Sequence, residues 1–149
     1  MLLPLTKHSR NIHDLSCNTG QEFLLISDLH WDNPHCDRGL LKNHLDEAVK
    51  RNAGIIVNGD FYCCMGGKFD RRADKSIIRP EHNTDRYFDA IVDTSVEWFA
   101  PYAKNLLLIG YGNHETSIIK HGETDLLQRF ASTLNYATGS AVEVGGYGG

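Results

Sequence analysis

Short apolar runs alternate with longer segments of helical periodicity along the chain. The runs at 22–28 (EFLLISD), 53–60 (AGIIVNGD) and 105–115 (NLLLIGYGNHE) are brief, and each ends in polar residues. Such runs are typical of buried strands. The segment 140–149 (SAVEVGGYGG) predicts the start of a fourth strand.

Helical spacing of apolar residues separates these strands. A helix is predicted between the first two strands, with Asp37 in position to be its N-cap. Two further amphipathic helices are predicted at about 84–104 and 123–134. The alternation of strands and helices favours an α/β fold with parallel strands. Residues 1–21 show no periodicity and are predicted to be a polar lead-in, whereas 61–83 form a long irregular loop of the kind that is usually functional or disordered.

Composition limits the classes of protein that the chain can belong to. Its 149 residues suffice for one domain, which we place at 22–149, and 41% hydrophobic with 23% charged residues is ordinary for a globular protein. The net charge of -4 does not indicate nucleic-acid binding, although such binding is possible. No apolar run approaches membrane-spanning length and no signal-peptide profile is present, so no membrane partner is expected. The vicinal pair Cys63–Cys64 is a poor disulfide candidate, and we expect a reducing, cytoplasmic location.

Polar side chains follow each of the first three strands directly. Asp28 and His30 follow the first, Asp60 follows the second, and Asn113 and His114 follow the third. Because the carboxyl ends of parallel strands meet at one edge of a sheet, these side chains are expected to converge. Residues two apart on an extended segment point the same way, so Asp28 and His30 can bind one ion together. Carboxylate, imidazole and amide oxygen are ligands for Mn²⁺, Fe²⁺ and Zn²⁺.

Each of these short motifs also has an ordinary structural explanation. Asp-x-His can be a capped loop, and Asn-Gly-Asp and Gly-Asn-His are common turn sequences. Their occurrence in order, each after an apolar strand, favours a metal site. Gly59 and Gly112 beside the ligands allow sharp turns and close backbone approach. The neighbouring Trp31, Asp32 and Asn33 are interpreted as loop residues.

Three further histidines are not expected to bind a metal ion. His35, His82 and His121 lack the spacing of a ligand set, and all three are predicted to be surface histidines.

The three motifs SDLH, NGD and GNHE together resemble the signature of the calcineurin-like metallophosphoesterases. The resemblance implies a β-sandwich flanked by helices in four α/β/β/α layers, with two divalent ions (Mn, Fe or Zn) at the strand ends. It implies that Asp28 and His30 bind the first ion, Asp60 bridges both, and Asn113 binds the second. His114 would be the general acid or a phosphate-contacting group, and Asp28 could orient it. The implied reaction is hydrolysis of phosphomonoesters or phosphodiesters by a water activated by the two ions.

The long loop contains basic residues that could serve such a substrate. Arg71 and Arg72 are candidate contacts for the phosphate group, although a solvated loop explains them as well. Whether the substrate is a nucleic acid, a nucleotide or a phosphoprotein is left open by the sequence, as is the oligomeric state.

Two departures from the family signature bear on activity. Cys63 stands where an acidic residue often follows the Gly-Asp motif, and the later histidine motifs of the family do not follow Glu115. We therefore expect the chain to be the amino-terminal portion of a longer enzyme, with the sandwich incomplete, and to be weakly active or inactive by itself. The alternative is a non-catalytic metal-binding or interaction module derived from the same fold.

Overall fold

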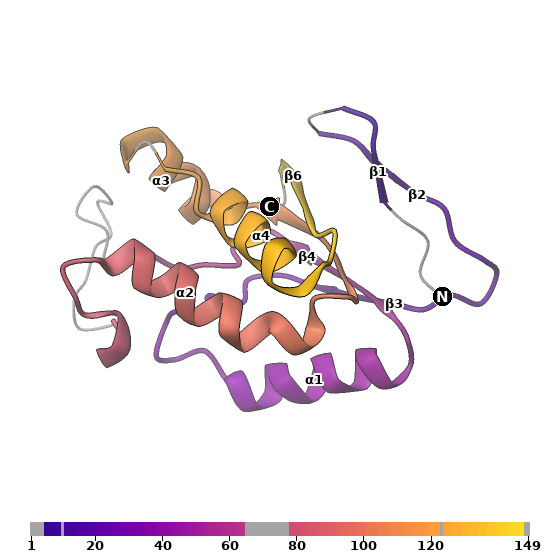
Figure 1. Cartoon of the computed structure of the whole chain (residues 1–149), viewed down its shortest axis with the longest axis horizontal. Helices are drawn as coiled ribbons and strands as arrows, with labels where there is room; N and C mark the ends of the chain where they lie inside the picture. The colour runs from indigo at the N-terminus through magenta and orange to yellow at the C-terminus, as the bar shows by residue number, and fades with distance from the viewer. Residues whose placement is uncertain (1–4, 10, 65–77, 123, 148–149) are drawn as a thin grey trace.

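A four-stranded parallel sheet is the centre of the computed structural model, which describes residues 5–9, 11–64, 78–122 and 124–147 (Figure 1). The order of its strands is β3-β4-β5-β6. Their bounds are β3 (Phe23–Ile26), β4 (Gly54–Asn58), β5 (Leu106–Tyr111) and β6 (Glu143–Tyr147). All neighbouring pairs in this sheet are parallel, so the predicted α/β class is confirmed, and each of the four segments predicted to form strands contains one.

The α-helices of the described ranges are α1 (Arg38–Lys50), α2 (Tyr87–Phe99), α3 (Asn113–Gly122) and α4 (Leu126–Thr138). The predicted N-cap of α1 is confirmed, because the Asp37 side chain accepts a hydrogen bond from the Leu40 N–H at 2.9 Å. The helix predicted at 84–104 ends earlier, at Phe99. The short 3₁₀ helix η3 (Ala100–Tyr102) follows it and contains Pro101, which lacks the N–H that would continue α2. A second 3₁₀ helix, η2 (Pro80–His82), precedes α2.

Helix α3 was not predicted from the sequence. The strand predicted over 105–115 ends at Tyr111, and the residues from Asn113 onward form α3 instead. The helix predicted from residue 123 is α4, whose N-cap Asp125 accepts from the Gln128 N–H and whose C-cap Gly139 adopts a left-handed φ of 70°.

The lead-in carries structure that its lack of periodicity did not predict. Strands β1 (Leu5–Lys7) and β2 (His13–Leu15) pair in antiparallel fashion, with Leu5 opposite Leu15. Each strand is only three residues long, which is too short for an alternating pattern to be recognised.

The two faces of the sheet differ in burial. On one face Ile55, Val57 and Ile109 are at most 1% exposed. Figure 1 shows α2 and α4 in front of the strands, with α1 below them in the view. On the opposite face, Leu25 lies beside Ile56 in the register and is 70% exposed. The helices therefore bury one face, and the other presents apolar side chains.

An aromatic cluster lies beneath the carboxyl ends of the strands. The Phe61 ring centroid is 4.9 Å from those of both Phe99 and Phe130. Trp31 packs on Phe99 with a centroid distance of 6.2 Å and is 1% exposed. Trp31, which we interpreted as a loop residue, is thus part of the core.

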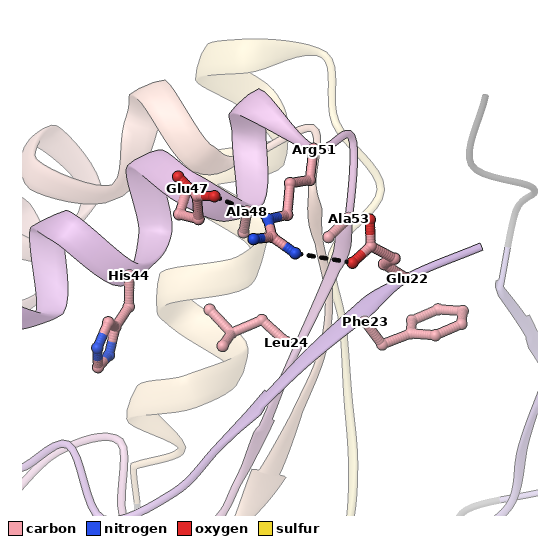
Figure 2. Close-up of a pocket in the computed structure, with 8 residues that line it drawn as sticks. All are labelled: Glu22, Phe23, Leu24, His44, Glu47, Ala48, Arg51 and Ala53. Atoms are coloured by element: carbon pink, nitrogen blue, oxygen red, sulfur yellow. Dashed lines mark hydrogen bonds and ion pairs between the residues drawn. The ribbon is translucent and has the colours of Figure 1, made fainter. Parts of the chain in front are cut away.

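The amino ends of the strands form a different environment. Arg51, the C-cap residue of α1, binds Glu47 at 2.7 Å and Glu22 at 3.1 Å, and so joins the end of the helix to the segment that enters β3 (Figure 2). These side chains line a pocket with Phe23 and Ala53, at the edge opposite to the predicted ligands. The pocket is therefore separate from the candidate site. Among the helices in the described ranges, none is long and apolar enough to cross a membrane.

Candidate metal centre

Three strand ends meet at the carboxyl edge of the sheet. His30 follows β3, Asp60 follows β4, and His114 lies in the first turn of α3 after β5. Each of the three offers one ligand atom, and these atoms all lie within 4.8 Å of one another. The rings of His30 and His114 meet edge to face, with centroids 5.1 Å apart. The structure thus brings together three of the predicted site residues.

Asp60 is the middle of this arrangement. Its backbone carbonyl accepts the His30 N–H at 3.1 Å, and its carboxylate oxygen Oδ1 accepts the His114 N–H at 3.3 Å. One residue earlier, the Gly59 carbonyl accepts the Asp28 N–H at 3.1 Å. The loops after β3 and β4 therefore remain hydrogen-bonded beyond the strands, and Asp60 connects both to α3.

The backbone of the candidate ligands is strained. Asp28, His30 and Asp60 have φ angles of 54°, 44° and 50°, in the left-handed region that side chains usually avoid. This conformation costs about 1–2 kcal/mol per residue, less for aspartate. Strain of this kind persists where the surroundings enforce it, and it concentrates at functional sites.

A buried residue follows each member of the group and holds it in place. Trp31 follows His30, Phe61 follows Asp60, and Glu115 follows His114. Their exposed fractions are 1%, 0% and 1%. Because each candidate ligand is adjacent to an anchored residue, its position depends on the core rather than on the loop alone.

Gly112 allows α3 to approach Asp60. A Cβ added at residue 112 would lie 2.0 Å from Asp60 Oδ1 and 2.4 Å from the Asp60 backbone nitrogen. Only glycine fits this contact, which confirms the close approach predicted from the sequence. Gly59 has a φ of 88°, as expected for the sharp turn before Asp60.

The remaining predicted site residues are placed less centrally. The Asp28 side chain is 67% exposed, and its Oδ1 is 3.9 Å from His30 Nε2, so it neighbours the group without belonging to it. Asn113 is exposed at the first residue of α3, directly before His114. The roles of both as ligands, and of Asp28 in orienting His114, stay predictions. Arg71 and Arg72 lie outside the described residues.

Two buried carboxylates at this edge were not assigned a role from the sequence. Glu115 accepts the Gly112 N–H at 3.0 Å and the Tyr62 N–H at 3.1 Å. Burial raises the pKa of Glu115 to about 8; the charge of Asp60 also raises it, whereas the two backbone donors lower it. Asp32, interpreted from the sequence as a loop residue, is 4% exposed and is hydrogen-bonded to the loop after Asp60.

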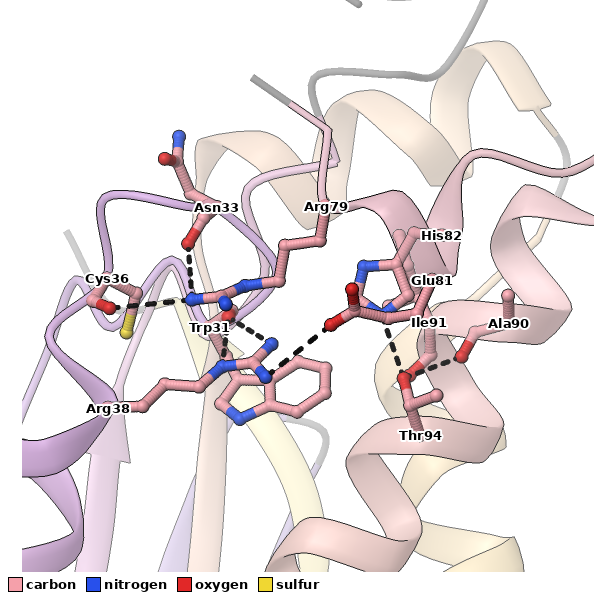
Figure 3. Close-up of polar contacts among 10 residues, drawn as sticks. All are labelled: Trp31, Asn33, Cys36, Arg38, Arg79, Glu81, His82, Ala90, Ile91 and Thr94. Carbon is pink, nitrogen blue, oxygen red and sulfur yellow. Dashed lines mark hydrogen bonds and ion pairs between the residues drawn. The ribbon is translucent and has the colours of Figure 1, made fainter. Parts of the chain in front are cut away.

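Two arginines join the first loop to the segment before α2 (Figure 3). The guanidinium carbon of Arg38 lies 3.7 Å from the Trp31 ring centroid, and its Nε and Nη2 donate to the Trp31 carbonyl at 3.1 and 2.9 Å. Arg38 also forms an ion pair with Glu81, with 3.9 Å between its Nη1 and Glu81 Oε1. Arg79 donates to the Asn33 carbonyl at 3.0 Å. The guanidinium groups of both arginines therefore hold the loop that follows His30.

The prediction for His82 was wrong. Its side chain is fully buried, at 0% exposure, and its Nε2 is 2.8 Å from the Thr94 hydroxyl (Figure 3). Burial lowers its pKa, so the neutral ring is favoured. A lone histidine in an irregular segment gave no periodic signal of this burial. His35 is exposed, as predicted, and the His121 side chain lies outside the described residues.

The donor set fits a divalent ion of intermediate hardness. Two imidazoles and one carboxylate are ligands of Zn²⁺, Mn²⁺ and Fe²⁺. Ligand atoms about 2.1 Å from a tetrahedral ion lie ~3.4 Å from one another. The three donors of the group lie within 4.8 Å of one another, a separation near that spacing. The Nδ1 atom of His30 is buried and has no hydrogen-bond partner within the described part of the chain.

Comparisons with protein-family models, with curated proteins and with solved structures found no match to this chain.

Proposed function

We propose that this chain carries the metal centre of a calcineurin-like phosphoesterase, which hydrolyses phosphomonoester or phosphodiester bonds. The observation that carries the proposal is the grouping of His30, Asp60 and His114 at one edge of a parallel sheet. The three motifs occur in the order of the family signature, and each contributes one member of the group.

In this proposal, the residues at the strand ends are assigned to two metal ions. Asp28, His30 and Asp60 would hold the first ion, and Asp60 and Asn113 would hold the second. A divalent ion bound here would supply an activated water and offset the charge of the phosphoryl oxygens. The buried residues that follow the three ligands, Trp31, Phe61 and Glu115, keep the group in place, so little reorganisation is needed when a substrate binds.

His114 has two possible roles within the proposed reaction. Its imidazole can complete the ligand set, or it can protonate the departing oxygen. Its backbone N–H is held by Asp60 and its ring faces His30, which suits both roles. A His114→Ala variant separates them: loss of Mn²⁺ affinity indicates a ligand, whereas unchanged affinity with a reduced kcat indicates an acid.

The proposed sandwich architecture is supported by the uncovered face of the sheet. Leu25 and Ile56 lie side by side there, and Leu25 is 70% exposed. An apolar face of this kind is expected where another layer packs, as in the family fold that the motifs imply.

The test of the proposed function is hydrolysis during a Mn²⁺ titration. p-Nitrophenyl phosphate and bis(p-nitrophenyl) phosphate are the monoester and diester probes, and their relative rates distinguish a phosphatase from a nuclease-like enzyme. We expect slow, Mn²⁺-dependent turnover that is abolished in Asp60→Ala. The matched control is His35→Ala, which removes an exposed histidine from the same loop as His30 and should leave turnover unchanged.

A non-catalytic metal-binding module is the second candidate. It is favoured by the size of the group, since three donors suffice to hold one ion. Saturable Mn²⁺ binding without turnover of either ester, at any Mn²⁺ concentration, would favour this module over the enzyme.

A further inference from the structure

Three consecutive backbone N–H groups after Asp60 all donate to side-chain carboxylates. The Tyr62 N–H donates to Glu115 Oε2 at 3.1 Å. The Cys63 and Cys64 N–H groups donate to the two oxygens of Asp32, at 2.6 and 2.7 Å. This part of the loop is therefore held by side chains from two other segments.

The two carboxylates come from the two flanking motifs. Asp32 lies two residues after His30, and Glu115 directly follows His114. The second oxygen of Glu115 accepts the Gly112 N–H at 3.0 Å. The hydrogen bonds of Asp32 and Glu115 thus join the loops that carry the three candidate ligands, although neither carboxylate belongs to the ligand group.

Both of these acidic side chains are buried, so their hydrogen bonds matter for the stability of the loop. Asp32 is 4% exposed and Glu115 is 1% exposed. A buried carboxyl group is unfavourable unless it is well hydrogen-bonded, and each of these accepts two backbone N–H groups. Cys64 adopts a left-handed φ of 57°, a backbone arrangement in which successive N–H groups can point at one anion. The loop conformation and the Asp32 carboxylate therefore depend on each other.

We propose that Asp32 and Glu115 are positioning residues, which hold the 62–64 segment between the first and third loops and thereby set the separation of His30, Asp60 and His114. The inference rests on the proposed function, because the group that they position is the proposed metal centre. Neither residue touches the substrate or the ion. Removing either carboxylate leaves backbone donors unpaired and lets the loops separate.

The first readout needs no metal. In the metal-free chain, Asp32→Asn keeps the shape of the side chain but places an NH₂ group against a backbone donor. We expect the amides of 62–64 to exchange faster with solvent in this variant. We also expect the ¹H–¹⁵N ring signals of His30 and His114 to shift. Ring signals at their wild-type positions would overturn the proposal.

The matched control is a buried polar contact at the opposite edge of the sheet. The Asn105 side chain is 8% exposed and donates to the Ala53 carbonyl at 2.9 Å. Asn105→Ala should lower the urea midpoint and leave the ring signals of His30 and His114 in place. Equal shifts in this control would attribute the effect to lost stability and overturn the positioning role. Should Asp32→Asn fail to fold, Glu115→Ala, which removes both acceptor oxygens from the Tyr62 and Gly112 N–H groups, carries the same test.

The second readout is Mn²⁺ affinity, measured by calorimetry on the folded chain. Substitutions of residues that orient metal ligands typically weaken binding about 10- to 100-fold, and we expect this for Asp32→Asn but not for Asn105→Ala. Wild-type affinity in Asp32→Asn would overturn the proposal. A wild-type chain that binds no Mn²⁺ would overturn the proposed function instead, and the ring signals would still decide whether the two carboxylates position the histidines.

Discussion

Gly112 lies so close to Asp60 that a single added methyl group tests how firmly the candidate centre is held. A Cβ at residue 112 would lie 2.0 Å from Asp60 Oδ1 and 2.4 Å from its backbone nitrogen, whereas ordinary contact begins at 3.4 Å. The carboxylate oxygen would have to move by about 1.4 Å (3.4 minus 2.0) and the backbone nitrogen by about 1.0 Å (3.4 minus 2.4). Asp60 cannot move freely, since its carbonyl and carboxylate bind the N–H groups of His30 and His114.

The size of the effect follows from this displacement. Forcing an extra methyl group into a packed contact costs about 1–3 kcal/mol of unfolding free energy. A misplacement of ~1 Å in a functional group can lower activity about 100-fold. We therefore expect Gly112→Ala to be destabilised by ~1–3 kcal/mol and to bind Mn²⁺ at least ~10-fold more weakly than the wild type.

The same substitution elsewhere should have the opposite sign. At Gly39 in α1, the nearest atom to an added Cβ is Asp37 Oδ1 at 3.5 Å, which is ordinary contact. Gly39→Ala should therefore stabilise the chain by roughly 0.5 kcal/mol, because alanine favours the helix. Urea unfolding and Mn²⁺ calorimetry on both variants make the comparison. Wild-type stability and wild-type affinity in Gly112→Ala would refute the reasoning.

Three further predictions concern strain, protonation and the first loop. His30→Gly should be more stable than His30→Ala by about 1 kcal/mol in urea unfolding, because glycine relieves the left-handed φ of 44°; equal stability would show that no strain is stored there. The lowered pKa of His82 means that the unfolded chain binds this proton more readily than the folded one, so the contribution of His82 to stability should fall as pH decreases through about 6.5. The raised pKa of Glu115 acts in the opposite direction over the same range. The change in unfolding free energy from pH 7.5 to 5.5, measured in urea, should therefore be less favourable to the folded state in the wild type than in His82→Gln, and an equal change in both chains would contradict this assignment. Arg38→Ala should lose about 1–3 kcal/mol of stability, and Arg38→Lys should not restore it, since lysine lacks the planar fork that both stacks on Trp31 and binds its carbonyl; full stability of Arg38→Lys in urea would contradict this.

The sequence predicted the parts of the fold that depend on local pattern. The strands β3, β4 and β5 are apolar runs that end in polar residues, and the helices α1, α2 and α4 carry an apolar stripe. The convergence of His30, Asp60 and His114 was predictable because parallel strands place their carboxyl ends at one edge.

What the sequence could not predict depends on contacts between distant residues. Asp32 is polar in the sequence, and only the N–H groups of Cys63 and Cys64, about 30 positions away, make its burial favourable. His82 is buried because Thr94 of the following helix binds its ring. Trp31 sits among polar residues in the sequence, and its place in the core becomes visible only when Phe99 packs on it.

The central claim is that Asp60 organises a metal centre at the carboxyl edge of the sheet. Isothermal calorimetry with Mn²⁺ tests it most directly, on the wild-type chain, on Asp60→Ala and on the control Asp46→Ala, which removes an exposed carboxylate from α1. We expect saturable Mn²⁺ binding by the wild type and by Asp46→Ala, and loss of Mn²⁺ binding in Asp60→Ala. Equal binding by all three chains, or no binding by the wild type, would contradict it.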